Sequence, residues 1–223
     1  MKKILGIIPA YNEERRIAKV VLGALEHTPV LVLDDGSQDK TSQIAEKAGA
    51  QVIRQAPNQG KGVALRRGFQ EALISGYEAV ITLDADGQHD PGEIPTFVNA
   101  YRTSVADLII GERDFNQIPP VRRLANSLGR WIFSWAVGHP IPDNQSGYRL
   151  LSQRMMEAVL GSQESGFEFE VEMIVICLQS GYSLEWVPIK TIYQDEGSHI
   201  HPLQHIFEFT RMVLQTRRRM KNT

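Results

Sequence analysis

The sequence has little of what marks several protein classes. One cysteine in 223 residues, Cys177, rules out an internal disulfide and a Cys-rich zinc site, and it favours a reducing, cytoplasmic location. No apolar run approaches the ~20 residues that a membrane-spanning helix needs. Neither sign of charge is in excess, because 24 Lys and Arg against 26 Asp and Glu give a formal net charge of -2. This balance argues against a nucleic-acid-binding protein.

The composition that remains is typical of a folded domain, with 42% hydrophobic and 22% charged residues. No repeat, low-complexity tract or linker divides the chain, so we expect a single domain over residues 1–223. The N-terminus is basic and then apolar, but its apolar part is too short for a signal peptide. We predict instead that this apolar part forms the first strand.

Short runs rich in β-branched residues alternate with amphipathic segments in the first half. The predicted strands are residues 4–8, 30–33, 51–53, 79–83 and 108–110, and the predicted helices are 13–25, 41–48, 61–75 and 91–101. This alternation predicts an α/β fold with a mostly parallel central sheet flanked by helices. The second half predicts helices at 119–137 and 167–179, an edge strand at 184–192 and an amphipathic stretch at 203–220.

Ligands of parallel sheets bind beyond the carboxyl ends of the strands. Three of these predicted ends carry carboxylates, at residues 13–14, 34–35 and 84–86. Carboxylates gathered at one edge repel each other unless a cation or a hydroxyl network neutralises or binds them. This edge is the candidate site.

Asp84-Ala85-Asp86 has the form D-x-D, and alternation along an extended chain points both carboxylates the same way. Such a pair can hold one hard divalent ion, since Mg²⁺ takes one or two carboxylates and completes its shell with water and substrate phosphates. Gln88 and His89 follow closely and are further candidate contacts, with Gln88 assigned to the metal. Asp90 before Pro91 is more typical of a helix cap.

Other loops leave alternatives open. Asp34 and Asp35 suit either a helix cap or contacts with a nucleobase and ribose hydroxyls. Lys61, flanked by glycines in residues 58–62, suits either a phosphate neighbour or a plain helix start. The segment departs from the P-loop pattern G-x-x-x-x-G-K-S/T, which excludes a P-loop ATPase. Asp143 after Pro142 is a site candidate or the start of an Asx turn.

Taken together, these motifs resemble a family 2 glycosyltransferase with the GT-A fold, and most of all its polyprenyl-phosphate branch, which includes dolichyl-phosphate mannose synthase. The resemblance lies in residues 8–13 (IPAYNE), 33–37 (LDDGS), 58–62 (NQGKG), 84–91 (DADGQHDP), 111–113 (GER) and 146–149 (SGYR). Each motif is weak alone, but the ordered set spans nearly the whole chain.

The resemblance implies inverting transfer of a sugar, mannose or glucose, from a GDP- or UDP-linked donor to a polyprenyl phosphate such as dolichyl or undecaprenyl phosphate. It also implies a divalent metal, Mg²⁺ or Mn²⁺. Residues 1–110 would form a Rossmann-like half that binds the nucleotide sugar, and residues 111–202 an acceptor half. Residues 203–223 would form an amphipathic, basic C-terminal helix.

Site roles follow from the resemblance and the motifs together. The residues assigned to the donor are Pro9, Tyr11, Glu13, Asp35, Lys61, Asp84 and Arg113. Those assigned to the metal are Asp84, Asp86 and Gln88. Those assigned to the acceptor phosphate are Arg123, Ser146, Arg149 and His199. The catalytic candidates are Asp86, Asp143 and Arg149.

The role of Asp143 depends on the acceptor. A phosphate acceptor has a second pKa of about 6 and needs no strong base, so Asp143 would then only orient the sugar. A glycan or glycolipid hydroxyl would need Asp143 as its base. A non-catalytic nucleotide-sugar-binding subunit is a third hypothesis, disfavoured by the intact acidic pair.

The C-terminal region departs from the family pattern. Many relatives carry a segment resembling R-x-x-G-x-S-K, whereas residues 195–202 here read DEGSHIHP, with His199 in place of the lysine and His201 nearby. Residues 211–221 contain five basic and no acidic residues. They suit a solvated helix face, a peripheral contact with anionic lipid headgroups, or a membrane-protein partner. The aromatic residues Trp131, Phe133 and Trp135 could assist a membrane contact, but we expect at least two of them to pack in the core.

Overall fold

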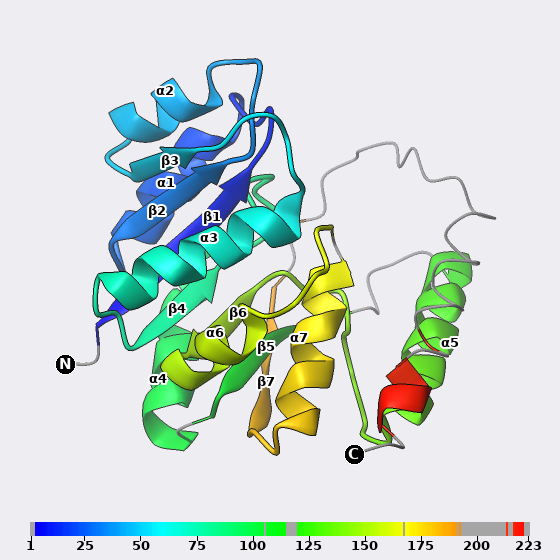
Figure 1. Cartoon of the computed structure of the whole chain (residues 1–223). Helices are drawn as coiled ribbons and strands as arrows, with labels where there is room; N and C mark the ends of the chain where they lie inside the picture. Colours follow the sequence, from blue (N-terminus) through cyan, green and yellow to red (C-terminus); the bar gives the residue numbers. More distant parts are fainter. Residues whose placement is uncertain are drawn as a thin grey trace.

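A twisted sheet runs through the centre of the computed structural model, which describes residues 3–104, 106–114, 120–166, 168–190, 192, 213 and 216–220, without the side chains of 120–128 (Figure 1). Within these residues the sheet has seven strands in the order β3-β2-β1-β4-β6-β5-β7. Their bounds are β1 Ile4–Ala10, β2 Val30–Asp34, β3 Gln51–Arg54, β4 Ala79–Thr82, β5 Leu108–Arg113, β6 Arg149–Ser152 and β7 Leu184–Ile189.

Most neighbouring strands are parallel, which confirms the predicted sheet. All five strands expected in the first half are present, and β7, which contains Pro188, lies at the edge as its proline predicted. Strand β6 was not predicted. It runs antiparallel to both of its neighbours, with Arg149 opposite Thr82 of β4 and Ile110 of β5.

Helices cover both faces of the sheet (Figure 1). The described helices are α1 Ile17–Leu25, α2 Thr41–Lys47, α3 Lys61–Ile74, α4 Ile94–Ser104, α5 Pro120–Val137, α6 Gln153–Val159 and α7 Glu168–Gln179, with the 3-10 turn η1 Pro91–Glu93 before α4; α5 stands beside the sheet, beyond α7. Alternate residues of β1 enter opposite cores: Ile8 packs with α1 and α4, whereas Ile7 packs with α3 and α7. Both faces of the strand are therefore apolar, as expected for a doubly covered parallel sheet.

Two caps fix helix starts locally. Asp90 accepts a hydrogen bond from the Gly92 N–H at 2.9 Å and stands before Pro91, which confirms its predicted capping role. Ser152 ends β6 and at once caps α6, accepting from the Met155 N–H at 3.3 Å.

Asp107 ties three strands together at the end of the sheet opposite the acidic loops. Its carboxylate accepts hydrogen bonds from the Ser152 hydroxyl at 3.0 Å and from the Ser183 N–H and hydroxyl at 2.9 and 3.0 Å. The Arg154 guanidinium also donates to both of its oxygens. These bonds join β5 to the end of β6 and the start of β7.

Helix α5 exposes two tryptophans, so the expectation that at least two of its three aromatic residues lie in the core was wrong. Trp131 is 69% and Trp135 53% exposed, and only Phe133 is buried. Residues four apart share one helix face, so Phe133 can point inward only if the two tryptophans point outward. The Arg217 guanidinium lies 4.8 Å from the Trp135 ring centre and donates to the Trp135 carbonyl at 3.0 Å. Among the described residues, no helix has both the length and the apolarity to cross a membrane.

Candidate active site

The loops after β1 and β2 are bonded to each other at the carboxyl edge of the sheet. The Asn12 N–H donates to the Ser37 hydroxyl at 2.9 Å, and the Glu13 N–H donates to the Thr41 hydroxyl at 2.8 Å. The Ser37 N–H in turn donates to Asp34 at 2.8 Å. Asp34 therefore stabilises the turn, which is the structural alternative that the sequence left open.

Asp35 fixes the loop that leads into α3. Its carboxylate is buried and accepts hydrogen bonds from the Gln55 amide at 2.6 Å and from the N–H groups of Gln59 and Gly60, both at 2.8 Å. The loop that carries Lys61 is thus held against the end of β2. A contact of Asp35 with a nucleotide stays a prediction.

The other residues assigned to the nucleotide lie along the same edge. Pro9 sits beyond the last pair that joins β1 to β4, Ile7 and Thr82, so its missing N–H removes no bond of that ladder. Tyr11 is 45% exposed. Burial raises the pKa of Glu13 against the effect of Arg16, and the negative charge of Asp86 raises that pKa further. The negative charge of Asp86 is therefore close enough to affect the ionisation of Glu13.

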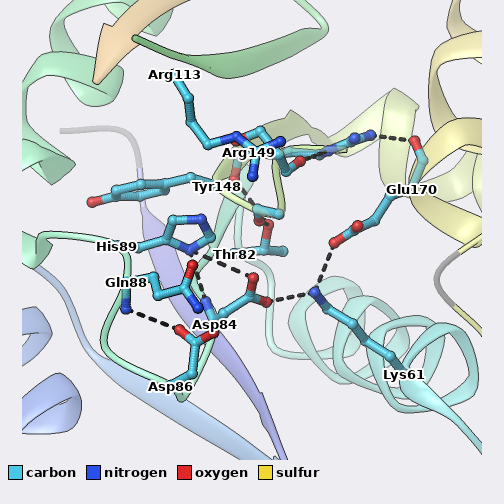
Figure 2. A network of polar contacts seen from close by, with 12 residues as sticks. Lys61, Thr82, Asp84, Asp86, Gln88, His89, Arg113, Tyr148, Arg149 and Glu170 are labelled. Atoms are coloured by element: carbon cyan, nitrogen blue, oxygen red, sulfur yellow. Dashed lines mark hydrogen bonds and ion pairs between the residues drawn. The ribbon is translucent and has the colours of Figure 1, made fainter. Parts of the chain in front are cut away.

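A lysine between two carboxylates forms the centre of the site (Figure 2). Lys61, the first residue of α3, places its Nζ 2.5 Å from Asp84 Oδ1 and 2.8 Å from Glu170 Oε1. Burial alone would lower the pKa of Lys61, but the two carboxylates outweigh it and raise that pKa above its usual range. Burial likewise opposes ionisation of Asp84, yet Lys61 and further positive charges lower the pKa of Asp84 to about 2. Both groups are charged at neutral pH.

The glycines beside Lys61 allow another segment to approach closely. The Gly62 N–H donates to the Ser165 carbonyl at 2.7 Å, and a Cβ on Gly62 would lie 2.7 Å from the Glu164 carbonyl oxygen. Gly60 has φ +98°, which favours glycine, and a Cβ there would overlap the Ser165 carbonyl. The glycines of this motif are thus explained by packing of α3 against the loop before α7.

The acidic loop after β4 is shaped by its own hydrogen bonds. Asp86 Oδ1 accepts from the Gln88 N–H at 2.9 Å, and the Asp84 N–H donates to His89 Nδ1 at 3.1 Å. His89 is buried beside the Tyr148 ring, and burial lowers the pKa of His89. His89 accordingly supports the turn from inside the protein. Asp84 and Asp86 are partly exposed.

Arg113 and Asp143 form a two-point ion pair at the end of β5. The guanidinium donates through Nε at 2.6 Å and through Nη2 at 2.9 Å to the two carboxylate oxygens. Asp143 also accepts from the Gln145 N–H at 3.1 Å, which is the Asx turn that the sequence allowed. Asp143 is 1% exposed, so both of its oxygens are engaged within the protein.

Arg149 lies under the loop of residues 143–148 and is completely buried. Its Nε donates to the Ser146 carbonyl at 2.7 Å and its Nη1 to the Glu170 carbonyl. Burial lowers the pKa of Arg149, although Glu170, Asp143 and Asp84 oppose this. In this structure Arg149 supports main-chain carbonyls, and a direct contact with a phosphate stays a prediction.

The remaining predicted acceptor residues are Ser146, Arg123 and His199. The Ser146 hydroxyl is buried and, among the described residues, has no hydrogen-bond partner. The side chain of Arg123 and the whole of His199 lie outside the described part of the chain, as does His201.

The comparisons with known proteins decide the family. The model of the family described as glycosyl transferase family 2 matches residues 7–159. The chain belongs to glycosyl transferase family 2. It is therefore an enzyme of the glycosyltransferase class, as its motifs predicted.

Relatives of this glycosyltransferase span most of its length. An undecaprenyl-phosphate mannosyltransferase of Micrococcus luteus is 32% identical over 214 residues, covering 87% of this chain and 86% of that protein. A UDP-N-acetylglucosamine–dolichyl-phosphate N-acetylglucosaminyltransferase of Methanococcus voltae is 29% identical over 220 residues, covering 87% of each. The resemblance to the polyprenyl-phosphate branch is thus confirmed.

A solved structure confirms the GT-A fold of the glycosyltransferase. Glucosyl-3-phosphoglycerate synthase from Mycobacterium tuberculosis, in complex with Mn²⁺, uridine diphosphate and phosphoglyceric acid, superposes with a TM-score of 0.74. The match covers 96% of this chain and 77% of that one, at 19% identity.

The carboxylates of the glycosyltransferase fit a divalent ion that a substrate also ligates. Over the described residues, no group of three or more His, Cys, Asp or Glu side chains could enclose a metal by itself. A pair of carboxylates is nevertheless the usual protein contribution to a Mg²⁺ site that substrate phosphates complete. A Cβ on Gly147 would lie 2.7 Å from Asp84 Oδ2, so a larger residue at this position would crowd that oxygen. The donor set of Asp84 and Asp86 therefore fits Mg²⁺ or Mn²⁺.

Sequence reasoning missed Glu170 as part of the glycosyltransferase site, and it assigned no role to Gly147, although this glycine lies in the SGYR motif. Gly147 also positions the loop, since its carbonyl accepts from the Thr82 hydroxyl at 2.7 Å. For Glu170 a signal was present. Acidic residues at 168, 170 and 172 cannot all lie on one face of a helix, so at least one must turn toward the interior.

Proposed function

We propose that this glycosyltransferase moves a sugar from a nucleoside diphosphate sugar to the phosphate of a polyprenyl phosphate, with inversion at the anomeric carbon. The sugar, mannose or glucose, and the nucleotide, GDP or UDP, are predictions within this proposal. Two relatives whose names specify different sugars both specify a polyprenyl phosphate, which favours the lipid acceptor over any one donor.

The state of Asp143 is the observation that carries the choice of acceptor. A general base must lie within hydrogen-bond reach of the proton that it removes. Both oxygens of Asp143 accept hydrogen bonds from Arg113, and the side chain is 1% exposed. Asp143 is therefore poorly placed to take a proton from a hydroxyl. A phosphate acceptor is already largely ionised at neutral pH and needs no such base.

The carboxylates at the carboxyl edge of the sheet would act on the nucleoside diphosphate sugar, the donor. Asp84 and Asp86 would hold the divalent ion, with Gln88 as a further candidate ligand. When bound, that ion supplies positive charge next to the departing nucleoside diphosphate. Lys61 adds a fixed cation beside Asp84, and Arg113 is held at the other side of the loop by Asp143.

A donor panel with a short polyprenyl phosphate tests the proposal. The full chain is incubated with GDP- and UDP-linked sugars and Mg²⁺ or Mn²⁺, and we expect an acid-labile, phosphate-linked product. Asp86→Asn should abolish transfer, whereas the matched control Asp90→Asn, which replaces only a cap, should retain it. A product linked through a hydroxyl would instead support the alternative in which Asp143 is the base, and hydrolysis alone would refute both.

We further propose a peripheral contact with the cytoplasmic membrane face. The exposed Trp131 and Trp135 lie on α5, and residues 216–220 contain three arginines, of which Arg217 stacks on Trp135. Tryptophan suits the interface between water and lipid, and each basic residue near an anionic surface adds roughly 1 kcal/mol of binding. A membrane-protein partner that covers the same tryptophans is the alternative.

A further inference from the structure

We propose that Glu170 is a positioning residue of this active site. It holds the Lys61 ammonium between two carboxylates and so sets how much negative charge Asp84 presents to a divalent cation. This inference rests on the proposed function, because it takes Asp84 and Asp86 as the metal-binding pair.

The contacts of Lys61 show that its charge is shared. Its Nζ lies 2.5 Å from Asp84 and 2.8 Å from Glu170, in the arrangement drawn in Figure 2. The carboxylates of Asp84 and Glu170 also lie close to each other, because both would crowd the same added atom. A Cβ on Gly147 would lie 2.7 Å from Asp84 Oδ2 and 2.8 Å from Glu170 Oε1. Two anions this close repel each other strongly unless a cation lies between them.

Glu170 is held rigidly enough to act in this way. It is 5% exposed in the first turn of α7, and its carbonyl accepts a hydrogen bond from the buried Arg149. The loop before α7 is bonded to the start of α3 through Gly62 and Ser165, at 2.7 Å. Lys61 and Glu170 therefore come from two segments that are packed together next to the ion pair.

The balance of charge gives the expected direction. An ammonium bound to Asp84 repels a second cation from the same carboxylate, and the pull of Glu170 on that ammonium weakens this competition. When Glu170 is neutralised, Lys61 is drawn more closely onto Asp84, and a divalent ion should bind less tightly. When Lys61 is removed, this competition disappears, and Glu170 acts on the ion only through its own negative charge, so its effect should be smaller.

Binding of Mn²⁺ to the full chain without donor tests this directly, with free Mn²⁺ measured by electron paramagnetic resonance at pH 8. Glu170→Gln should weaken binding about tenfold or more, the range found when groups behind a metal ligand are removed. Glu170→Asp keeps the charge but withdraws it by one methylene, so it should weaken binding as Glu170→Gln does. Glu168→Gln, an exposed position on the same helix, is the matched control and should bind as the unmodified chain does.

The double variant separates positioning from a general charge effect. Lys61→Met should tighten Mn²⁺ binding, and adding Glu170→Gln to it should weaken binding by a smaller factor than Glu170→Gln does in the unmodified chain. The double variant removes the Lys61–Glu170 ion pair as a whole, and thermal unfolding verifies the fold of each variant.

Equal weakening by Glu170→Gln with and without Lys61 would overturn the inference, as would unchanged binding by Glu170→Asp or by every Glu170 variant. Failure of the proposed function looks different. In that case the unmodified chain does not bind Mn²⁺, or binds it equally well after Asp86→Asn, and the inference falls with the metal assignment.

Discussion

Replacing Gly147 with alanine tests whether the loop before β6 sets the position of the Asp84 carboxylate. The added Cβ would lie 2.7 Å from Asp84 Oδ2 and 2.8 Å from Glu170 Oε1, whereas ordinary contact begins at 3.4 Å. Asp84 must therefore retreat by about 0.7 Å, the difference between 3.4 and 2.7 Å. Overpacking of this kind costs about 1–3 kcal/mol of stability, and a displacement near 1 Å of a catalytic group lowers the rate about 100-fold.

The assay compares kcat/KM, Mn²⁺ affinity and thermal unfolding of Gly147→Ala with those of Gly161→Ala. A Cβ on Gly161 would have nothing within 4 Å, so this control should change the free energy of unfolding by less than about 0.5 kcal/mol and leave activity intact. We expect Gly147→Ala to lose far more activity than its stability loss explains. Unchanged turnover and Mn²⁺ affinity in Gly147→Ala would refute this reasoning.

The remaining predictions concern regions away from the acidic loops. Asp107→Asn should lower the free energy of unfolding at pH 7 by about 1–3 kcal/mol in urea denaturation, because it removes the charge that Arg154 and Ser183 stabilise. Burial opposes ionisation, but those hydrogen bonds lower the pKa of Asp107 to about 2, so its stabilisation is complete above about pH 4 and is lost as the pH falls toward 2. A gap between the two proteins that stays constant down to pH 2 would contradict this. Trp131→Ser should reduce flotation with anionic vesicles, whereas Leu22→Ser, which is 55% exposed on α1, should not; equal losses would argue against a specific membrane-facing surface.

The parallel part of the fold could be predicted because each of its strands is a short apolar run bounded by turn residues. Strand β6 lacks that signal, because it runs directly into α6 at Ser152 without turn residues between them. Its conformation is decided by pairing with β4 and β5, which are distant in sequence. Local pattern carries no information about such partners.

The acidic pair of the site could be predicted because parallel topology places the residues after each strand at one edge. The environment of the cations could not be predicted in the same way. Lys61 was recognised as a candidate, but its second partner Glu170 lies more than 100 residues away and reads locally as an ordinary acidic residue near a helix start. Arg149 was recognised as a cation, yet its burial beneath main-chain carbonyls depends on the packing of α7.

Because β6 pairs with β4, the sheet next to the acidic loops is completed only late during synthesis. Strand β4 gains its second neighbour only when residues 149–152 have been made, 70 residues after Thr82. At translation rates of about 5–20 residues per second, this interval lasts roughly 4–14 s. During that time the backbone N–H and C=O groups along the unpaired side of β4 can pair incorrectly with another strand. We therefore expect nascent chains that end between β4 and β6 to be the species that aggregate or bind chaperones, whereas chains that extend beyond α7 do so much less.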